Sequence, residues 1–281
     1  MSARKARPAQ RTSPEAKTEE EKVEERSPPI TPVIYEVVRR MGEEEMARPA
    51  VSLWWSGVAA GLSISFSLLA EAVLQMRVPE SSWRPLVTAL GFPIGFLMVV
   101  LGRQQLFTET TITMVLPVMA KPTSTNVGLL GRVWSIILAA NLVGTLLAAL
   151  VCTFTPAISP EVRESMLELS RHALDKGWVE MVFRGITAGF LMAAMVWLIP
   201  SADTAAFYVV AVMTYLIAIS DSVHIVTGSL QAFLLLANGQ GDAGALLGGF
   251  ALPVLVGNII GGTVLFALIS YAQVMNEIPR R

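Results

Sequence analysis

The chain has 281 residues, of which 53% are hydrophobic and 15% charged, and beyond residue 50 its apolar runs are long enough to need lipid around them. Its net charge of -1 favours neither nucleic acid nor an acidic surface as a partner, and its single cysteine, Cys152, excludes an internal disulfide framework. We therefore expect a polytopic, all-α membrane protein with no nucleic-acid partner.

The first 30 residues differ in composition from the rest of the chain. "MSARKARPAQRTSPEAKTEEEKVEERSPP" mixes basic, acidic, Pro and Ser residues with almost no apolar ones, so it cannot bury enough surface to offset chain entropy. The segment also lacks the apolar region and the small-residue cleavage site of a signal peptide. Residues 1–30 are therefore predicted to be a disordered tail on the cytoplasmic side.

Residues 31–48 are predicted to form an amphipathic helix. Thr31 can cap it, and Pro32 suits the first helical position. Apolar residues then recur at helical spacing: Ile34, Val37, Val38 and Met41. We expect this helix to lie along the membrane or a neighbouring subunit, ahead of the first span.

Six membrane crossings are predicted over residues 51–272. A crossing helix needs about 20 apolar residues. Four stretches satisfy this length: 51–74, 130–152, 178–200 and 245–272. Two others, 86–119 and 205–236, are too long for one straight span and carry polar residues near the middle, so each is predicted to be one crossing broken into two half-helices. Six crossings put both termini on one side, and the Lys and Arg residues of the short loops favour the cytoplasm, which makes residues 273–281 a second cytoplasmic tail.

An internal repeat relates the two halves of the chain. "ANLVGTLL" at residues 140–147 resembles "GNIIGGTVL" at 257–265, which aligns Asn141 with Asn258 at a shift of 117 residues. The same shift leads from Phe107, in the first break, to His224, in the second. Because each half has an odd number of crossings, the halves must run in opposite directions, and the repeat is predicted to be an inverted 3+3 repeat.

Polar residues interrupt the second and fifth crossings at "GRQQLFTET" (102–110) and "SDSVHIVTGS" (220–229). Backbone that leaves the helical ladder at membrane depth survives only inside protein or beside an aqueous cavity. Both breaks are therefore expected to face a permeation path, the alternative being a polar kink buried between subunits. Arg103 and Glu109 are expected to pair with each other, and Glu71, near the end of the first span, to extend outward. His172, in a predicted surface helix, has no assigned role.

Several motifs resemble the formate/nitrite transporter family. They are "GFPIGF", "LFTETT", "NLVG", the histidine of the second break and "LPVLVGNIIGG", and in this order they extend the resemblance over about residues 33–271. The resemblance implies an aquaporin-like six-helix protomer, a homopentamer with one pore per protomer, and passage of small monovalent weak-acid anions. We expect the protein in the bacterial cytoplasmic (inner) membrane, in contact with lipid.

The resemblance also carries over residue by residue. Leu106, Phe107 and Thr108 match the loop of the first break, and His224 matches the family's central histidine. Thr108 is therefore expected beside His224, and all four residues are expected to line the substrate pathway.

Apolar constrictions and a vestibule complete that pathway. Phe92 and Phe96 fall at constriction positions of the second crossing, and Ile217 falls at the partner position of the fifth. Lys176 is the nearest match to a basic residue of the outer vestibule, although its loop spacing differs.

The sequence departs from the family pattern at several positions. Val223 replaces an acidic residue directly before the histidine, and Gly228 replaces an Asn four residues after it. Gly189 replaces an Asn of the fourth crossing, and the run "RQQ" ahead of "LFT" is also unusual. This pattern resembles a divergent, YfdC-like branch of uncertain function, so the fold carries over better than the substrate.

The function that follows is a channel or transporter for small monovalent weak-acid anions. An anion at the bilayer centre costs several kcal/mol, a cost that it avoids by crossing as the neutral acid. His224, hydrogen-bonded to Thr108, could stabilise the anion or donate the proton. The alternatives are a non-conducting pentameric membrane protein that acts through its cytoplasmic tail, and a neutral-solute pore. No metal-ligand spacing, nucleophile constellation or phosphate-binding loop occurs, so we expect no enzyme activity, metal or cofactor.

Overall fold

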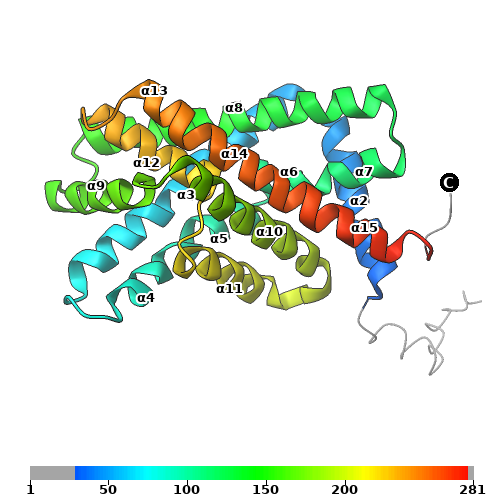
Figure 1. The fold of residues 1–281 in the computed structure, drawn as a ribbon, viewed down its shortest axis with the longest axis horizontal. Helices are drawn as coiled ribbons and strands as arrows, with labels where there is room; N and C mark the ends of the chain where they lie inside the picture. The colour runs from blue at the N-terminus through cyan, green and yellow to red at the C-terminus, as the bar shows by residue number, and fades with distance from the viewer. Residues whose placement is uncertain (1–28, 278–281) are drawn as a thin grey trace, which may run out of the picture.

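The computed structural model describes residues 29–277, and the regular secondary structure in this range is helical throughout (Figure 1). The prediction of an all-α protein is therefore confirmed. Residues 1–28 and 278–281, which include most of the predicted N-terminal tail, lie outside the described residues.

Five helices in the described range are long and apolar enough to cross a membrane. Three are single helices: α3 (Ala50–Arg77), α8 (Ser124–Phe154) and α10 (Trp178–Ala202). The other two, Arg84–Leu101 and Ala243–Val274, are runs of shorter helical pieces. The first run contains α4 (Arg84–Thr88), η1 (Ala89–Gly91) and α5 (Pro93–Leu101). The second contains α13 (Ala243–Ala245), η3 (Leu246–Ala251), α14 (Leu252–Ile259), η4 (Ile260–Ala267) and α15 (Leu268–Val274).

The remaining apolar helices are shorter. α6 (Phe107–Thr113) and α7 (Val115–Ala120) follow α5, with a non-helical segment between α5 and α6. After η2 (Asp203–Ala205), α11 (Ala206–Ile219) and α12 (Ile225–Ala237) are separated in the same way. The polar runs of the sequence therefore coincide with these two interruptions. α9 (Pro160–Leu174) lies between α8 and α10 in the chain and packs on α3 and α12.

α2 (Thr31–Ala47) and α9 lie at opposite ends of the molecule, and α15 lies at the end that carries α2 (Figure 1). α2 packs against α6, α7, α8, α10 and α15. The predicted capping role of Thr31 is wrong, because a cap residue stays extended outside the helix. Ile30 holds that position with ψ of 156°, no side chain caps the helix, and Thr31 already belongs to the first turn.

Both interruptions begin in the same way, with a non-glycine residue in the left-handed conformation. Arg103, two residues after the end of α5, has φ of 53°, and Asp221, two residues after the end of α11, has φ of 52°. After each, the chain turns back to bond its own helix: Gln104 N donates to Val99 O at 3.0 Å, and Ser222 N donates to Ile217 O at 3.1 Å. These bonds satisfy carbonyls that a helix end leaves unpaired.

Both interruptions also end alike. Leu106 is the N-cap of α6 with φ and ψ of -109° and 128°, and His224 is the N-cap of α12 with -108° and 130°. Leu106 therefore corresponds to His224, and the predicted match of Phe107 with His224 is off by one residue. The reason is a difference in spacing between the halves: Asn141 lies 34 residues after Phe107, whereas Asn258 lies 33 residues after Ile225.

Close approach of two helix pairs depends on glycine. α3 packs on α8 and α10 packs on α14. A Cβ on Gly61 would collide with Asn141 O, and a Cβ on Gly189 would collide with Asn258 O. No larger residue fits at these contacts without moving backbone, which accounts physically for glycine at position 189.

Candidate functional site

One asparagine side chain holds the first break in place. Asn141 Oδ1 accepts from Phe107 N at 2.9 Å, and Asn141 Nδ2 donates to Gln105 O at 2.8 Å and to Gly57 O at 2.9 Å. Asn141 is fully buried. A single amide therefore satisfies backbone groups on both sides of the N-cap of α6, which would otherwise be costly in an apolar surrounding.

Asn258 makes the same set of bonds at the second break. Its Oδ1 accepts from Ile225 N at 2.9 Å, and its Nδ2 donates to Val223 O at 3.0 Å and to Gly185 O at 2.9 Å. The sequence repeat identified Asn141 and Asn258 as equivalent but gave neither a task. A polar amide at equivalent places in two apolar runs was the signal that could have revealed it.

His224 connects the two breaks. Its Nε2 lies 2.6 Å from Thr108 Oγ1, and its Nδ1 accepts a 3.3 Å hydrogen bond from Thr227 N, which caps α12. Because Nδ1 is occupied as an acceptor, the neutral ring carries its proton on Nε2 and donates it to Thr108. The ring is 1% exposed in the protomer and can take a second proton only by giving up the helix cap.

Five further residues predicted for the pathway are apolar and come from different segments of the chain. The Phe96 ring lies edge-on to the His224 ring with centroids 5.1 Å apart, and the Phe92 ring lies 5.0 Å from that of Phe96. Ile217 of α11 and Leu106 are buried. The Phe107 ring instead packs edge-on against Trp134 of α8 at 5.6 Å.

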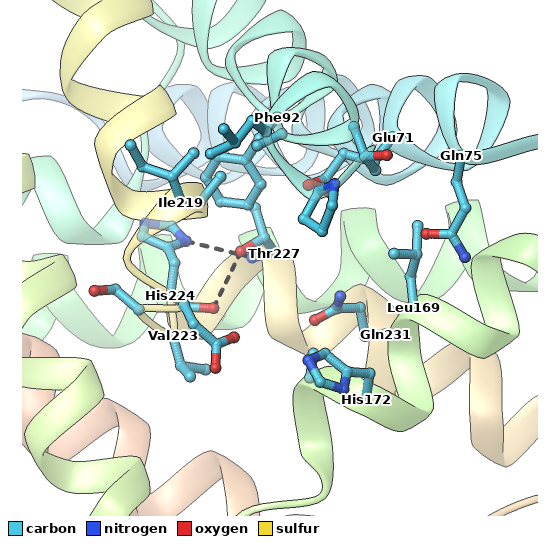
Figure 2. Close-up of a pocket in the computed structure, with 18 of the residues that line it drawn as sticks. Glu71, Gln75, Phe92, Leu169, His172, Ile219, Val223, His224, Thr227 and Gln231 are labelled. Atoms are coloured by element: carbon cyan, nitrogen blue, oxygen red, sulfur yellow. Dashed lines mark hydrogen bonds between the residues drawn. The ribbon is translucent and has the colours of Figure 1, made fainter. Parts of the chain in front are cut away.

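A cavity of about 510 Å³ extends along α3, α9 and α12 and reaches His224 (Figure 2). Phe92 and Thr227 line it together with His224. Glu71 and His172 also line it, although no role was predicted for His172 and Glu71 was expected to extend outward. Sequence analysis could not place these two residues there, because α9 folds back over α3 through tertiary contacts.

Lys176 lies in the wall of this cavity, with its charge engaged. Its Nζ donates to His172 O at 3.2 Å and to Ala173 O at 3.3 Å, and lies 3.4 Å from Asp221 Oδ1. Asp221 also forms an ion pair with Arg184. Lys176, the basic residue predicted for the outer vestibule, therefore lies at this cavity, and its ammonium group is paired with Asp221.

The predicted pairing of Arg103 with Glu109 is wrong for the residues that the structure describes. No ion pair joins the two, and Glu109 Oε1 is buried without a hydrogen-bond partner. Arg103 is the left-handed residue just after α5, and it is exposed. In residues 29–277 no group of three His, Cys, Asp or Glu side chains could hold a metal ion.

Comparisons with known proteins agree with these features. The family model described as formate/nitrite transporter matches residues 32–272. The inner membrane protein YfdC of Escherichia coli (strain K12) is 42% identical over 258 residues, which cover 92% of this chain and 83% of YfdC. The formate channel FocA of Haemophilus influenzae is 30% identical over 162 residues, which cover 56% of each chain.

Two solved structures share the fold. A pentameric formate channel with formate bound superimposes with a TM-score of 0.68 at 18% identity, over 82% of this chain and 98% of that one. An ion channel of the FNT family gives a TM-score of 0.72 at 21% identity, over 88% of this chain and 99% of that one.

Proposed function

The chain belongs to the formate/nitrite transporter family, and on that premise we propose that it is a membrane channel or transporter for small monovalent weak acids of the formate kind. Members of this family are transport proteins, so the chain is not an enzyme. The observation that carries the proposal is the 2.6 Å contact between Thr108 and His224, which joins the two breaks beside a cavity.

The proposed architecture has six crossings in an inverted 3+3 repeat. The second crossing consists of α4 to α7 and the fifth of α11 and α12, each broken at its polar run. Equivalent left-handed residues, N-caps and asparagine clamps at the two breaks support this arrangement. α2 and α15 lie at the same end of the molecule (Figure 1), which supports a common side for both ends of the described chain, and we propose that this side is cytoplasmic.

The proposed assembly is a homopentamer in the bacterial inner membrane. YfdC carries the name of an inner membrane protein, and one of the similar structures is a pentameric formate channel. Lipid then covers the apolar faces that remain exposed in the protomer. Each protomer would hold its own pathway, because the cavity and both breaks belong to one chain.

In the proposed mechanism, the anion enters the cavity and crosses beyond His224 as a neutral acid. The N-terminus of α12 makes the approach electropositive. A proton that arrives at Nδ1 of His224 releases the proton of Nε2 to Thr108, whose hydroxyl proton passes to the anion. The neutral acid then passes the apolar side chains of Phe92, Phe96, Leu106, Phe107 and Ile217 without the cost of a bare charge.

A flux assay tests the proposal. Proteoliposomes with an inward proton gradient should take up formate, nitrite, hydrosulfide or acetate faster than empty liposomes under the same gradient. Uptake of all four at the rate of empty liposomes would contradict transport.

One observation favours a second candidate, a non-conducting pentamer that acts through its cytoplasmic tail. The Phe250 ring fills the space beside Gly228, where a Cβ would collide with it. An apolar ring therefore occupies a place where the family resemblance led us to expect a polar Asn. The same flux assay separates the two candidates.

A further inference from the structure

The first break contains buried hydrogen-bond acceptors that no protein donor reaches. In the described part of the chain, Gln104, Gln105 and Glu109 each have an unpartnered, buried Oε1. Gln105 is only 7% exposed as a whole residue. Each buried acceptor without a donor costs about 1–3 kcal/mol. The buried oxygen atoms of this segment therefore outnumber the hydrogen-bond donors that reach them.

A carboxylate from α2 adds two more oxygens to the same place. Glu45 Oε2 accepts from Thr113 Oγ1 at 2.8 Å, and Glu45 Oε1 accepts from Gln105 Nε2 at 3.4 Å. Glu109 and Thr113 are four residues apart on α6 and share one face of it, whereas Gln105 precedes the extended N-cap Leu106. Because Glu45 bonds to Thr113, it lies beside the face of α6 that carries Glu109.

The charges nearby do not neutralise two carboxylates. Glu44 of α2, Arg48 directly after α2 and Arg103 of the break are the other charged groups that act on the pair. Among the residues that the structure describes, no salt bridge includes Glu45 or Glu109. Burial raises the pKa of Glu45, which lies outside the spans. Like charges in one poorly solvated site oppose each other, which disfavours ionisation of both carboxyl groups and favours one retained proton.

The position of this cluster follows from the correspondence of the two breaks. Leu106 corresponds to His224, so Glu109 corresponds to Thr227, which lines the cavity at α9. In an inverted repeat the equivalent place in the first break faces the opposite side. α2, which supplies Glu45, lies at the end of the molecule opposite α9 (Figure 1).

We propose that Glu109 and Glu45, with the side-chain oxygen of Gln105, form a proton-binding site on the side of the first break away from His224. The site holds one exchangeable proton. After the site releases that proton to the aqueous side, a neutral acid arriving from the constriction restores it: the O–H bond of the acid breaks, an O–H bond forms on the Glu109 carboxylate, and the anion departs. This transport role rests on the proposed function, whereas the occupancy of the site by a proton does not.

Infrared spectroscopy of the full-length protein in liposomes tests the occupancy. Near neutral pH the wild type should show the carbonyl stretch of a protonated carboxyl group that disappears in Glu109→Gln. Glu161→Gln, which removes an exposed carboxylate of α9, should leave the band in place. A band unchanged in both Glu109→Gln and Glu45→Gln would overturn the proposal. If Glu109→Gln fails to assemble, the band in Glu45→Gln decides whether the site holds a proton.

Formate flux tests the transport role. Glu109→Gln should lower uptake by at least about tenfold and remove its dependence on the pH of the far side, while Glu109→Asp keeps that dependence. A purely structural role would lower the yield of assembled protein and leave the pH profile of the remainder unchanged, which would overturn the transport role. If the wild type does not conduct at all, the proposed function fails, and the infrared band still decides whether the site holds a proton.

Discussion

His224 performs two tasks with one ring. Nδ1 caps α12 through Thr227 N, and Nε2 bonds Thr108 across the junction of the breaks. The cap stabilises a helix by about 1 kcal/mol, and the bond to Thr108 satisfies a buried hydroxyl. A substitution of His224 therefore distinguishes a structural effect from an effect on transport only if it keeps either the helix cap or the bond to Thr108.

His224→Phe removes both tasks and leaves an apolar ring of similar volume. Transport should fall by at least about tenfold, equivalent to about 1.4 kcal/mol in the barrier, because no titratable ring remains beside Thr108. Pentamer yield should change little, since the lost cap is small beside the burial of α12. Proteoliposome uptake with size-exclusion chromatography measures both. Flux equal to that of the wild type would rule out a role of His224 in transport, and loss of the pentamer would make the ring structural.

His224→Asn keeps the cap and a hydrogen-bonding side chain but cannot become cationic. Asn is among the best N-cap residues, so the variant should melt close to the wild type. Its uptake should persist at a reduced rate, with weaker anion selectivity and a flatter dependence on pH, because no ring relays a proton. Initial rates over a series of external pH values check this expectation. An unchanged pH profile would mean that protons do not pass through His224.

At the scale of elements, the two asparagine clamps do the most to keep non-helical backbone inside the bundle. Each connects a break to the glycine-bearing helix of its own half, at Gly57 or Gly185. Both asparagines are fully buried, so no water can take over their bonds without opening the helix pairs.

Asn141→Leu and Asn258→Leu should each destabilise the protein strongly. Three backbone groups lose their partner in either variant, and a buried unpaired group costs about 1–3 kcal/mol. Thermal unfolding in detergent should show midpoints several degrees lower for both, by similar amounts. Asn126→Ala, at the exposed start of α8, is the matched control and should stay within about 0.5 kcal/mol of the wild type. A clamp variant as stable as this control would contradict the assigned task.

The sequence located these breaks but not their contacts. Polar runs inside apolar stretches identify non-helical backbone because hydrocarbon penalises unpaired groups, and this rule needs no partner. The register predicted between the halves was off by one residue, because the spacing from Ile225 to Asn258 is one residue shorter than that from Phe107 to Asn141. The contact of Glu45 with Gln105 joins residues 60 positions apart, and no periodicity reports on such a contact.

At the scale of the whole molecule, polar groups gather at two opposite ends. The cavity with His224 lies along α9 (Figure 2), whereas Glu45 of α2 bonds to Thr113 and Gln105, and α2 lies at the end opposite α9 (Figure 1). Between them the Phe96 ring and Leu106 are buried in the protomer. Such an arrangement suits a solute that is charged at both mouths and neutral between them.

The assembly should be a homopentamer of the 30.3 kDa chain. Apolar side chains such as Phe154, Phe183 and Tyr208 are exposed in the protomer and need lipid or neighbouring subunits around them. Native mass spectrometry from detergent should show five copies of the chain, with or without bound lipid. A stable monomer or tetramer as the largest species would contradict this prediction.

Mixed pentamers should show whether each protomer conducts alone. The cavity, both breaks and the contact of Thr108 with His224 are formed by one chain, so a neighbour with His224→Phe should not alter the pathway of a wild-type protomer. Formate uptake should therefore fall in proportion to the fraction of variant chains when two tagged forms are co-expressed and purified together. Pure wild-type and pure variant pentamers fix the ends of the scale. A steep loss at a low fraction of variant would instead indicate a single shared path at the centre of the assembly, because one altered chain would then block all flux.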